Sequence, residues 1–486
     1  MEIVFHLFSS AYSLIFVVNL IFILAVLFSK KSPAKIFSWL LVLYFMPLFG
    51  FVLYLFFGID WRKRSIVHRL TQSDRVTLAD LEERTQEAIG AKPEARRMKA
   101  LMTMASVTTR LPVCANNSVQ VIHDPSEAFE AICSDMLGAR HHIHLEFYII
   151  QPDSTGSKFL SIVLKKADEQ VKIRIIVDAV GSKRSFRCHF FDKIRAHPNV
   201  EIIAFQPIKF PLVNLKANYR NHRKMIVVDG ALGYLGGMNI GDEYLGKTKR
   251  FGYWRDTMIR LEGQSAQNIQ TVFFQDWHFV KREKLPRNKA YYPDLSQRVF
   301  GNQLVQMVTS SPHANWDTIA QLYFGSITAA RETLYITTPY FIPDEALMRA
   351  LKAAVLGGVE VVILVPGKAD RRIQLSFLAT AAYLEDALLA GIKVYQYDPE
   401  RFIHAKVITV DGIFASIGSA NVDQRSMNIN FEMNALIYDR KIVKDINEAF
   451  FRDLENSSQL TREMVSAKSS GTLIAESLVR LLSPIL

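Results

Sequence analysis

The chain has 486 residues, of which 49% are apolar and 22% charged, and 58 Lys and Arg against 47 Asp and Glu give a net charge of +11. This length predicts two or three domains. The 32 Phe and 17 Tyr supply more core than a disordered chain carries, and only 23 Gly and 17 Pro exclude a collagen-like protein. Three cysteines without a CxxC motif fit reduced thiols better than a disulfide framework.

Two apolar runs without Asp, Glu, Lys or Arg lie at the N-terminal end, at residues 3–28 and 36–59. Each exceeds the ~20 residues that a helix needs to cross a bilayer. The short basic segment between them predicts a transmembrane helical hairpin over residues 1–60. A cleaved signal peptide is disfavoured, because the first run is too long and lacks a basic start. Basic residues after the second run favour a plasma-membrane protein whose catalytic domain is cytoplasmic.

The rest of the chain contains an internal repeat. Apolar runs of strand length alternate with helical patterns in the same order twice, which predicts an α/β fold. We expect a mixed sheet flanked by helices, duplicated about a pseudo-twofold axis with a shared site between the halves. The expected parts are a charged helical stalk at 61–105, a first half at 106–280, a linker at 281–300 and a second half at 301–486.

The strongest signal is a motif, His-x-Lys followed by Asp-Gly, that occurs twice with the same spacing. Its members are His222, Lys224 and Asp229 in the first copy and His404, Lys406 and Asp411 in the second. Residues i and i+2 of a strand point to one face, so each His and Lys project together. Two His-Lys pairs without an acidic metal cluster are typical of a metal-free phosphate-ester site. The Asp residues belong to the same catalytic motif, although an Asp-Gly pair also fits a hairpin turn.

Each motif is followed at the same offset by small residues and an Asn. These residues are Gly237 and Asn239 in the first half and Ser419 and Asn421 in the second. Small residues let an anion approach the backbone, and Asn supplies an NH2 donor. They are therefore our candidates for binding or supporting the phosphate.

Each catalytic His needs a carboxylate that sets its tautomer. Asp256, after the first motif, and Glu432, after the second, are the candidates, and ordinary charges at a sheet edge are the alternative. The nearby histidines His141, His142 and His144 have no carboxylate or Cys at a ligand spacing, so we expect no metal and no cofactor.

Beyond the paired motifs, three segments carry a resemblance: Leu145-Glu-Phe-Tyr, Thr338-Pro-Tyr-Phe and Gly418-Ser-Ala-Asn-Val-Asp. The paired motif resembles the phospholipase D superfamily. Together with the apolar hairpin, the three segments resemble the bacterial cardiolipin synthases within it. The resemblance implies that two phosphatidylglycerol molecules give cardiolipin and glycerol through a phosphatidyl-histidine. It also implies that His222 is the nucleophile and His404 the acid and base, an order that the residues alone leave open.

Three other activities use the same type of site: a phospholipase D-type hydrolase, another phosphatidyltransferase such as a phosphatidylserine synthase, and a nuclease. A charge of +11 on 486 residues is modest for a nuclease. We therefore expect phosphatidylglycerol and membrane phospholipid as partners, and no nucleic acid. The C-terminal segment from Leu473 has i, i+4 apolar spacing, which fits an interfacial helix or a helix packed on the domain.

Overall fold

The computed structural model describes residues 17–29, 33–54, 78–207, 218–312, 314, 316–367, 374–481 and 483. The chain divides into two compact units. One comprises residues 1–67 and 209–218, and the other comprises residues 68–208 and 219–486.

The smaller unit contains a helix at residues 17–27, α2 (Pro33–Phe45) and α3 (Pro47–Leu53). Val26, Leu43 and Tyr54 form their buried apolar cluster. The expected apolar span at 36–59 is divided after Phe45, where Pro47 begins a new helix. Residues 3–16 and 55–59 of the expected spans lie outside the described residues. Among the described residues, no helix is long and apolar enough to cross a membrane.

The larger unit contains two sheets of matching topology. The first has the order β1-β8-β6-β5-β2-β3-β4, in which β2, β3 and β4 are parallel and the others antiparallel. The strands are β1 (Asn117–Ile122), β2 (His142–Phe147), β3 (Lys172–Asp178), β4 (Val200–Phe205), β5 (Met225–Val228), β6 (Leu232–Gly236) and β8 (Met258–Gly263).

The second sheet repeats this arrangement with one added edge strand, in the order β17-β12-β11-β10-β14-β15-β16-β9. Here β10, β11 and β12 are parallel. The duplicated mixed sheet predicted from the sequence is confirmed. The strands are β9 (Val305–Ser310), β10 (Thr333–Thr337), β11 (Glu360–Pro366), β12 (Lys393–Tyr397), β14 (Val407–Val410), β15 (Phe414–Gly418), β16 (Glu432–Ile437) and β17 (Ser457–Leu460).

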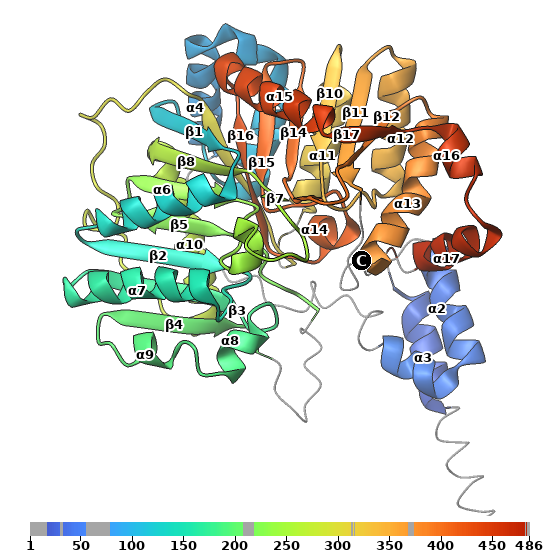
Figure 1. The fold of residues 1–486 in the computed structure, drawn as a ribbon, viewed down its shortest axis with the longest axis horizontal. Coiled ribbons are helices and arrows are strands. Elements are labelled where there is room, and N and C mark those ends of the chain that lie inside the picture. The colour runs from blue at the N-terminus through green and yellow to red at the C-terminus, as the bar shows by residue number, and fades with distance from the viewer. Residues whose placement is uncertain are drawn as a thin grey trace, which may run out of the picture. The chain divides into compact units, whose positions relative to one another are not determined.

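Helices cover the outer faces of both sheets (Figure 1). A third apolar core joins the inner faces and includes side chains of both halves. Two helices, α10 (Gln264–Lys281) and α15 (Arg440–Glu455), contribute side chains to this third core. The other helices are α6 (Pro125–Leu137), α7 (Ser154–Asp168), α8 (Lys183–Arg187), α9 (Asp192–Arg195), η5 (Asp242–Leu245), α11 (Thr318–Ala329), α12 (Glu345–Leu356), α13 (Gln374–Leu389), α14 (Gln424–Asn428), α16 (Arg462–Ser466) and α17 (Ser470–Arg480).

The end of the expected stalk forms part of the globular unit. It contains α4 (Leu78–Ala91), η4 (Pro93–Met98) and α5 (Lys99–Thr109). Buried side chains of these helices, Leu101 and Met102 among them, join the core of the second half. The apolar residues of these helices are therefore buried against the second half. The many charged residues of the segment led us to expect an exposed stalk instead.

Two short parallel pairings cross between the halves next to the repeated motifs. Asn221 bridges Phe431, so the chain before the first motif runs beside the start of β16. In the same way, β13 (Phe402–Ile403) pairs with β7 (Trp254–Arg255). Each pairing aligns the residue before a motif His with the residue before a carboxylate of the other half. The two halves are thus joined at the point where their functional residues begin.

Candidate active site

His222 lies just before β5 and faces a carboxylate of the second half. Its Nδ1 is 3.0 Å from Glu432 Oε1 and 3.1 Å from Oε2. Glu432 is fully buried and accepts further hydrogen bonds from Ser419 and Ser426 hydroxyls, at 2.6 and 3.0 Å. Burial raises the pKa of Glu432, but His222, Lys224 and Ser419 outweigh it and hold that pKa below its usual value. An ionised Glu432 keeps the proton of His222 on Nδ1, so Nε2 carries the lone pair.

His404 has the matching arrangement in the other direction. Its Nδ1 is 2.7 Å from Asp256 Oδ2, and its ring packs 5.0 Å from the Trp254 ring. Burial, and secondly the Lys406 charge, lower the pKa of His404 to about 3. Burial also lowers the pKa of His222. Both imidazoles are therefore neutral near pH 7 before an anion binds.

The two carboxylates are those that the sequence singles out, but each faces the histidine of the other half. The backbone explains this exchange. His222 N–H donates to Phe431 O at 2.9 Å, and His404 N–H donates to Arg255 O at 2.7 Å. Each His is thus held beside the residue that precedes its carboxylate. Distance along the chain could not reveal such a pairing.

The two motif lysines are buried, and the charge of Lys406 affects the pKa of Lys224. Lys224 Nζ donates to the His222 carbonyl at 2.6 Å, and Lys406 Nζ donates to the His404 carbonyl. Burial lowers the pKa of Lys406 to about 8 and that of Lys224 well below its usual value, and the Lys406 charge lowers the latter further. Two buried cations that repel each other are costly unless an anion lies between them. The site is therefore electrostatically suited to a phosphodiester.

The small residues after each motif make room for the carboxylates. A Cβ on Gly237 would lie 2.2 Å from Asp256 Oδ1. At the matching position, Ser419 donates its hydroxyl to Glu432. We expected these positions to let an anion approach the backbone. The contacts show instead that they accommodate and hydrogen-bond the carboxylate that faces each histidine.

The two asparagines differ in their contacts. Asn239 uses Oδ1 to accept the Ile149 N–H at 3.1 Å, so its NH2 group remains the part that can donate. Asn421 already donates from Nδ2 to Asp423 at 3.0 Å, and its buried Oδ1 has no partner among the described residues. Asn239 therefore fits the expected role of phosphate donor better than Asn421.

Asp229 and Asp411 lie at the opposite ends of their strands from the histidines. Both have positive φ and sit in turns followed by Gly, as an Asp-Gly hairpin requires. Asp229 accepts three backbone N–H groups, from residues 140–142, at 2.8–2.9 Å. Asp411 accepts the N–H groups of residues 331–333 at 2.8–3.1 Å. The structure thus gives both Asp residues turn contacts and does not bring them to His222 or His404.

The other histidines of the first half pack away from this site. His142 and His144 are buried on β2, where Gln270 of α10 lies 3.3 and 3.0 Å from their ring nitrogens. Burial lowers both pKa values. No group of three or more His, Cys, Asp or Glu within the described ranges could hold a metal ion.

Two aromatic residues at the site were not assigned a role from the sequence. The Tyr148 ring packs edge-on against His222 at 5.1 Å, and the Trp254 ring packs against His404 in a tilted arrangement. Tyr148 ends the Leu145-Glu-Phe-Tyr segment quoted above for another reason, and Trp254 precedes the Arg255-Asp256 pair. An aromatic residue where a strand ends beside a motif is the signal that could have identified them.

Comparison with known proteins identifies the family of this chain. The model described as "Cardiolipin synthase, PLD-like domain" matches residues 132–277 and 323–454. The chain belongs to this family. A second model, of a phospholipase D-nuclease N-terminal segment, matches residues 17–58.

Curated relatives cover nearly the whole chain. A cardiolipin synthase of Oceanobacillus iheyensis is 39% identical over 483 residues, which cover 97% of this chain and 98% of the relative. One from Geobacillus kaustophilus is 37% identical over 476 residues, with 98% and 94% covered. The fold also matches a phosphatidylserine synthase of Haemophilus influenzae, with a TM-score of 0.61 and 16% identity over 81% of this chain and all of that one.

The turn contacts of the two Asp residues generate a stability prediction. Asp229→Ala and Asp411→Ala should each reduce the free energy of unfolding by about 2–4 kcal/mol, because three backbone N–H groups lose their acceptor. The turnover of the folded fraction should stay close to wild type. Chemical denaturation and turnover per folded molecule measure the two effects. Lost turnover at unchanged stability would instead assign both residues to the chemistry.

Proposed function

We propose that this chain transfers a phosphatidyl group from one phosphatidylglycerol to another, giving cardiolipin and glycerol. The family to which the chain belongs supports this reaction. The observation that carries it is the arrangement of two neutral histidines and two buried lysines in one site, each His facing an ionised carboxylate.

In the first step, His222 Nε2 attacks the donor phosphorus. The P–N bond forms as the P–O bond to the head-group glycerol breaks, and His404 gives its proton to the leaving oxygen. Because burial and Lys406 lower the pKa of His404, this histidine needs the negative charge of the bound phosphodiester to become protonated. Protonation of the acid is thereby coupled to substrate binding.

In the second step, the roles are reversed. The glycerol hydroxyl of a second phosphatidylglycerol gives its proton to His404, and its oxygen attacks the phosphorus. The P–N bond to His222 breaks, which releases cardiolipin and restores both histidines. Throughout, Lys224 and Lys406 stabilise the nonbridging oxygens, while Glu432 and Asp256 hold the imidazoles in orientation. This scheme needs no cofactor.

The test is to incubate purified enzyme with phosphatidylglycerol liposomes and to quantify cardiolipin, free glycerol and phosphatidic acid. Cardiolipin and glycerol should appear in equal amounts, because each transfer releases one glycerol. His222→Ala and His404→Ala should each abolish both products. Phosphatidic acid as the main product would assign a hydrolase, and activity in either variant would refute the shared two-histidine site.

The proposed substrate implies a membrane location, and two apolar surfaces support it. In the N-terminal unit, Phe28, Phe37 and Tyr44 are among many large apolar residues whose side chains are exposed. Such an apolar surface is stable in contact with lipid rather than water. We place residues 1–60 in the plasma membrane and the catalytic unit on its cytoplasmic side.

The second surface is on α17, which packs on the domain with one face only. Val479 is buried against α13, and Arg480 forms a 2.6 Å ion pair with Asp386. On the other face, Ile474 and Leu478 are each 60% exposed and Leu481 is 76% exposed. The inner face of the helix therefore packs on the domain, and we assign its outer face to the bilayer interface.

Replacing this outer face tests the membrane assignment. The double variant Ile474→Asp/Leu478→Asp should lower cardiolipin formation several-fold in reconstituted phosphatidylglycerol vesicles, because charged side chains oppose insertion. Leu356→Asp, at an 86% exposed position of α12, is the matched control and should retain activity. Equal activity of the double variant and the control, at equal thermal stability, would exclude a membrane role for α17.

A further inference from the structure

A buried polar network lies behind His222 and has no part in the chemistry described above. The residues on either side of this histidine each reach a carboxyl group of the first half. Asn221 Nδ2 donates to Glu146 Oε1, and the Arg223 guanidinium forms an ion pair with Asp276 of α10. The four residues are at most 4% exposed.

This network also reaches the backbone of Glu432, the residue whose carboxylate faces His222. Arg223 Nε donates to the Glu432 carbonyl at 3.1 Å, and its Nη2 donates to the Ser310 carbonyl at 2.9 Å. Arg223 N–H donates to Asn221 Oδ1 at 3.1 Å. The position of His222 relative to Glu432 therefore depends on the residues that hold Asn221 and Arg223.

The network contains two carboxyl groups and one cation. Arg223 neutralises Asp276, whereas the Glu146 carboxyl receives only the neutral amide of Asn221. Glu146 Oε2 has no donor among the described residues and lies beside the Asp276 carboxyl. Two carboxyl oxygens that face each other in a buried site repel unless a proton lies between them. A proton on Glu146 satisfies both oxygens.

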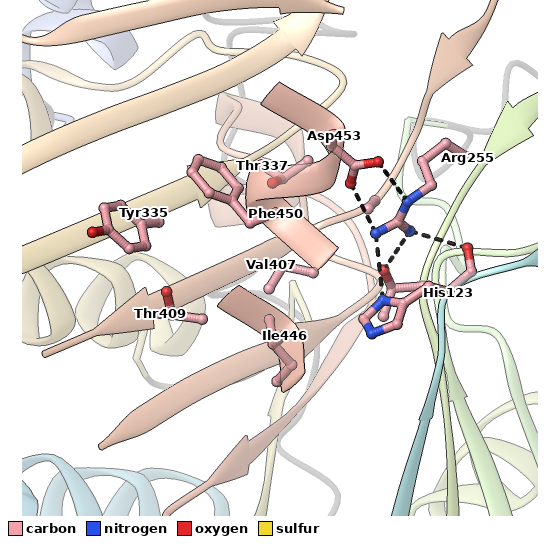
Figure 2. A pocket seen from close by; sticks show the side chains of 11 residues that line it. His123, Arg255, Tyr335, Thr337, Val407, Thr409, Ile446, Phe450 and Asp453 are labelled. Carbon is pink, nitrogen blue, oxygen red and sulfur yellow. Dashed lines mark hydrogen bonds and ion pairs between the residues drawn. The ribbon is translucent and has the colours of Figure 1, made fainter. Parts of the chain in front are cut away.

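At the positions of the second half that correspond to Glu146, Asn221 and Arg223, the described residues form no such network. By strand register, Thr337 takes the place of Glu146, and Ile403 and Ala405 take the places of Asn221 and Arg223. A cavity of about 10 Å³, enough for about one water, lies there instead, lined by Thr337 and Ala405. Figure 2 shows the ion pair of Arg255 and Asp453 at its edge. Of the two motif histidines, His222 is therefore the one whose neighbours on both sides bind a buried carboxyl group.

We propose that Glu146 is a positioning residue that keeps its proton in the folded enzyme, accepting from Asn221 and donating to Asp276 so that His222 is held against Glu432. This inference rests on the proposed role of His222 as nucleophile. A nucleophile must stay aligned with phosphorus through both steps, whereas a proton carrier tolerates more movement. The asymmetry of the network matches that division of roles.

The surroundings of Glu146 agree with a retained proton. Burial, and secondly the Asp276 carboxylate, raise the pKa of Glu146 well above its usual value, while Arg223 and Asn221 oppose them. His144, on the same face of β2, is neutral because burial lowers its pKa. The cation beside Glu146 is Arg223, and this guanidinium already pairs with Asp276.

The first test compares neutral substitutes at the two acids. Gln reproduces a protonated Glu, with one acceptor and one donor, so Glu146→Gln should keep kcat within about twofold of wild type. Glu146→Ala should lower kcat about a hundredfold with little change in KM, because the His222 segment shifts. Asp276→Asn should be strongly destabilised, since Arg223 loses its counter-charge. If Glu146→Gln lost as much thermal stability as Asp276→Asn, the proposal would be overturned.

The second test uses thermal unfolding and needs no turnover, so it stands even if the proposed reaction fails. Above the usual pKa of Glu, unfolding lets wild-type Glu146 lose its proton, so wild-type stability falls as pH rises. Gln has no such proton. The Tm of Glu146→Gln minus that of wild type should therefore increase between pH 6 and pH 8. A pH-independent difference, as expected of the control Glu130→Gln at an exposed ion pair, would contradict a retained proton.

Discussion

The proposed catalytic site depends on the two short backbone pairings that cross between the halves. Asn221 pairs with Phe431, and β13 pairs with β7, so each motif histidine lies beside the chain that leads into a carboxylate of the opposite half. His222 and Glu432 are 210 residues apart in the sequence, and the first pairing brings them together. Neither half therefore contains a complete His–carboxylate pair of its own. The duplication gives one site because the halves exchange this single interaction.

Burial gives this shared site its chemistry. It keeps both imidazoles neutral and lowers the pKa values of both lysines, while His and Lys contacts keep the carboxylates ionised. The protein thus holds cations whose charge a phosphodiester would balance, and substrate binding repays the cost of burying them. The pseudo-twofold symmetry is broken behind the histidines, where Arg223 and Glu146 in one half take the places of Ala405 and Thr337 in the other.

The sequence predicted the sheets and the candidate residues, but not their partners. The order of apolar runs and helical patterns, which occurs twice, predicted the duplicated sheet, because local apolar patterns decide where buried strands lie. Asp256 and Glu432 were identified, yet spacing along the chain carries no information about a crossed pairing. Gly237 was expected beside an anion, and it makes room for Asp256 instead. Glu146 had no assigned role, since a single Glu in an apolar strand gives no sign of what its carboxyl meets.

The central claim is that one site, built by both halves, uses His222 as nucleophile and His404 as proton carrier. The most direct measurement supplies phosphatidyl-p-nitrophenol, whose leaving group needs no proton. His404→Ala should release one equivalent of nitrophenol per enzyme, and mass spectrometry should locate a phosphatidyl group on the peptide that carries His222. His222→Ala should give neither. A burst in His222→Ala with the adduct on His404 would contradict the assignment.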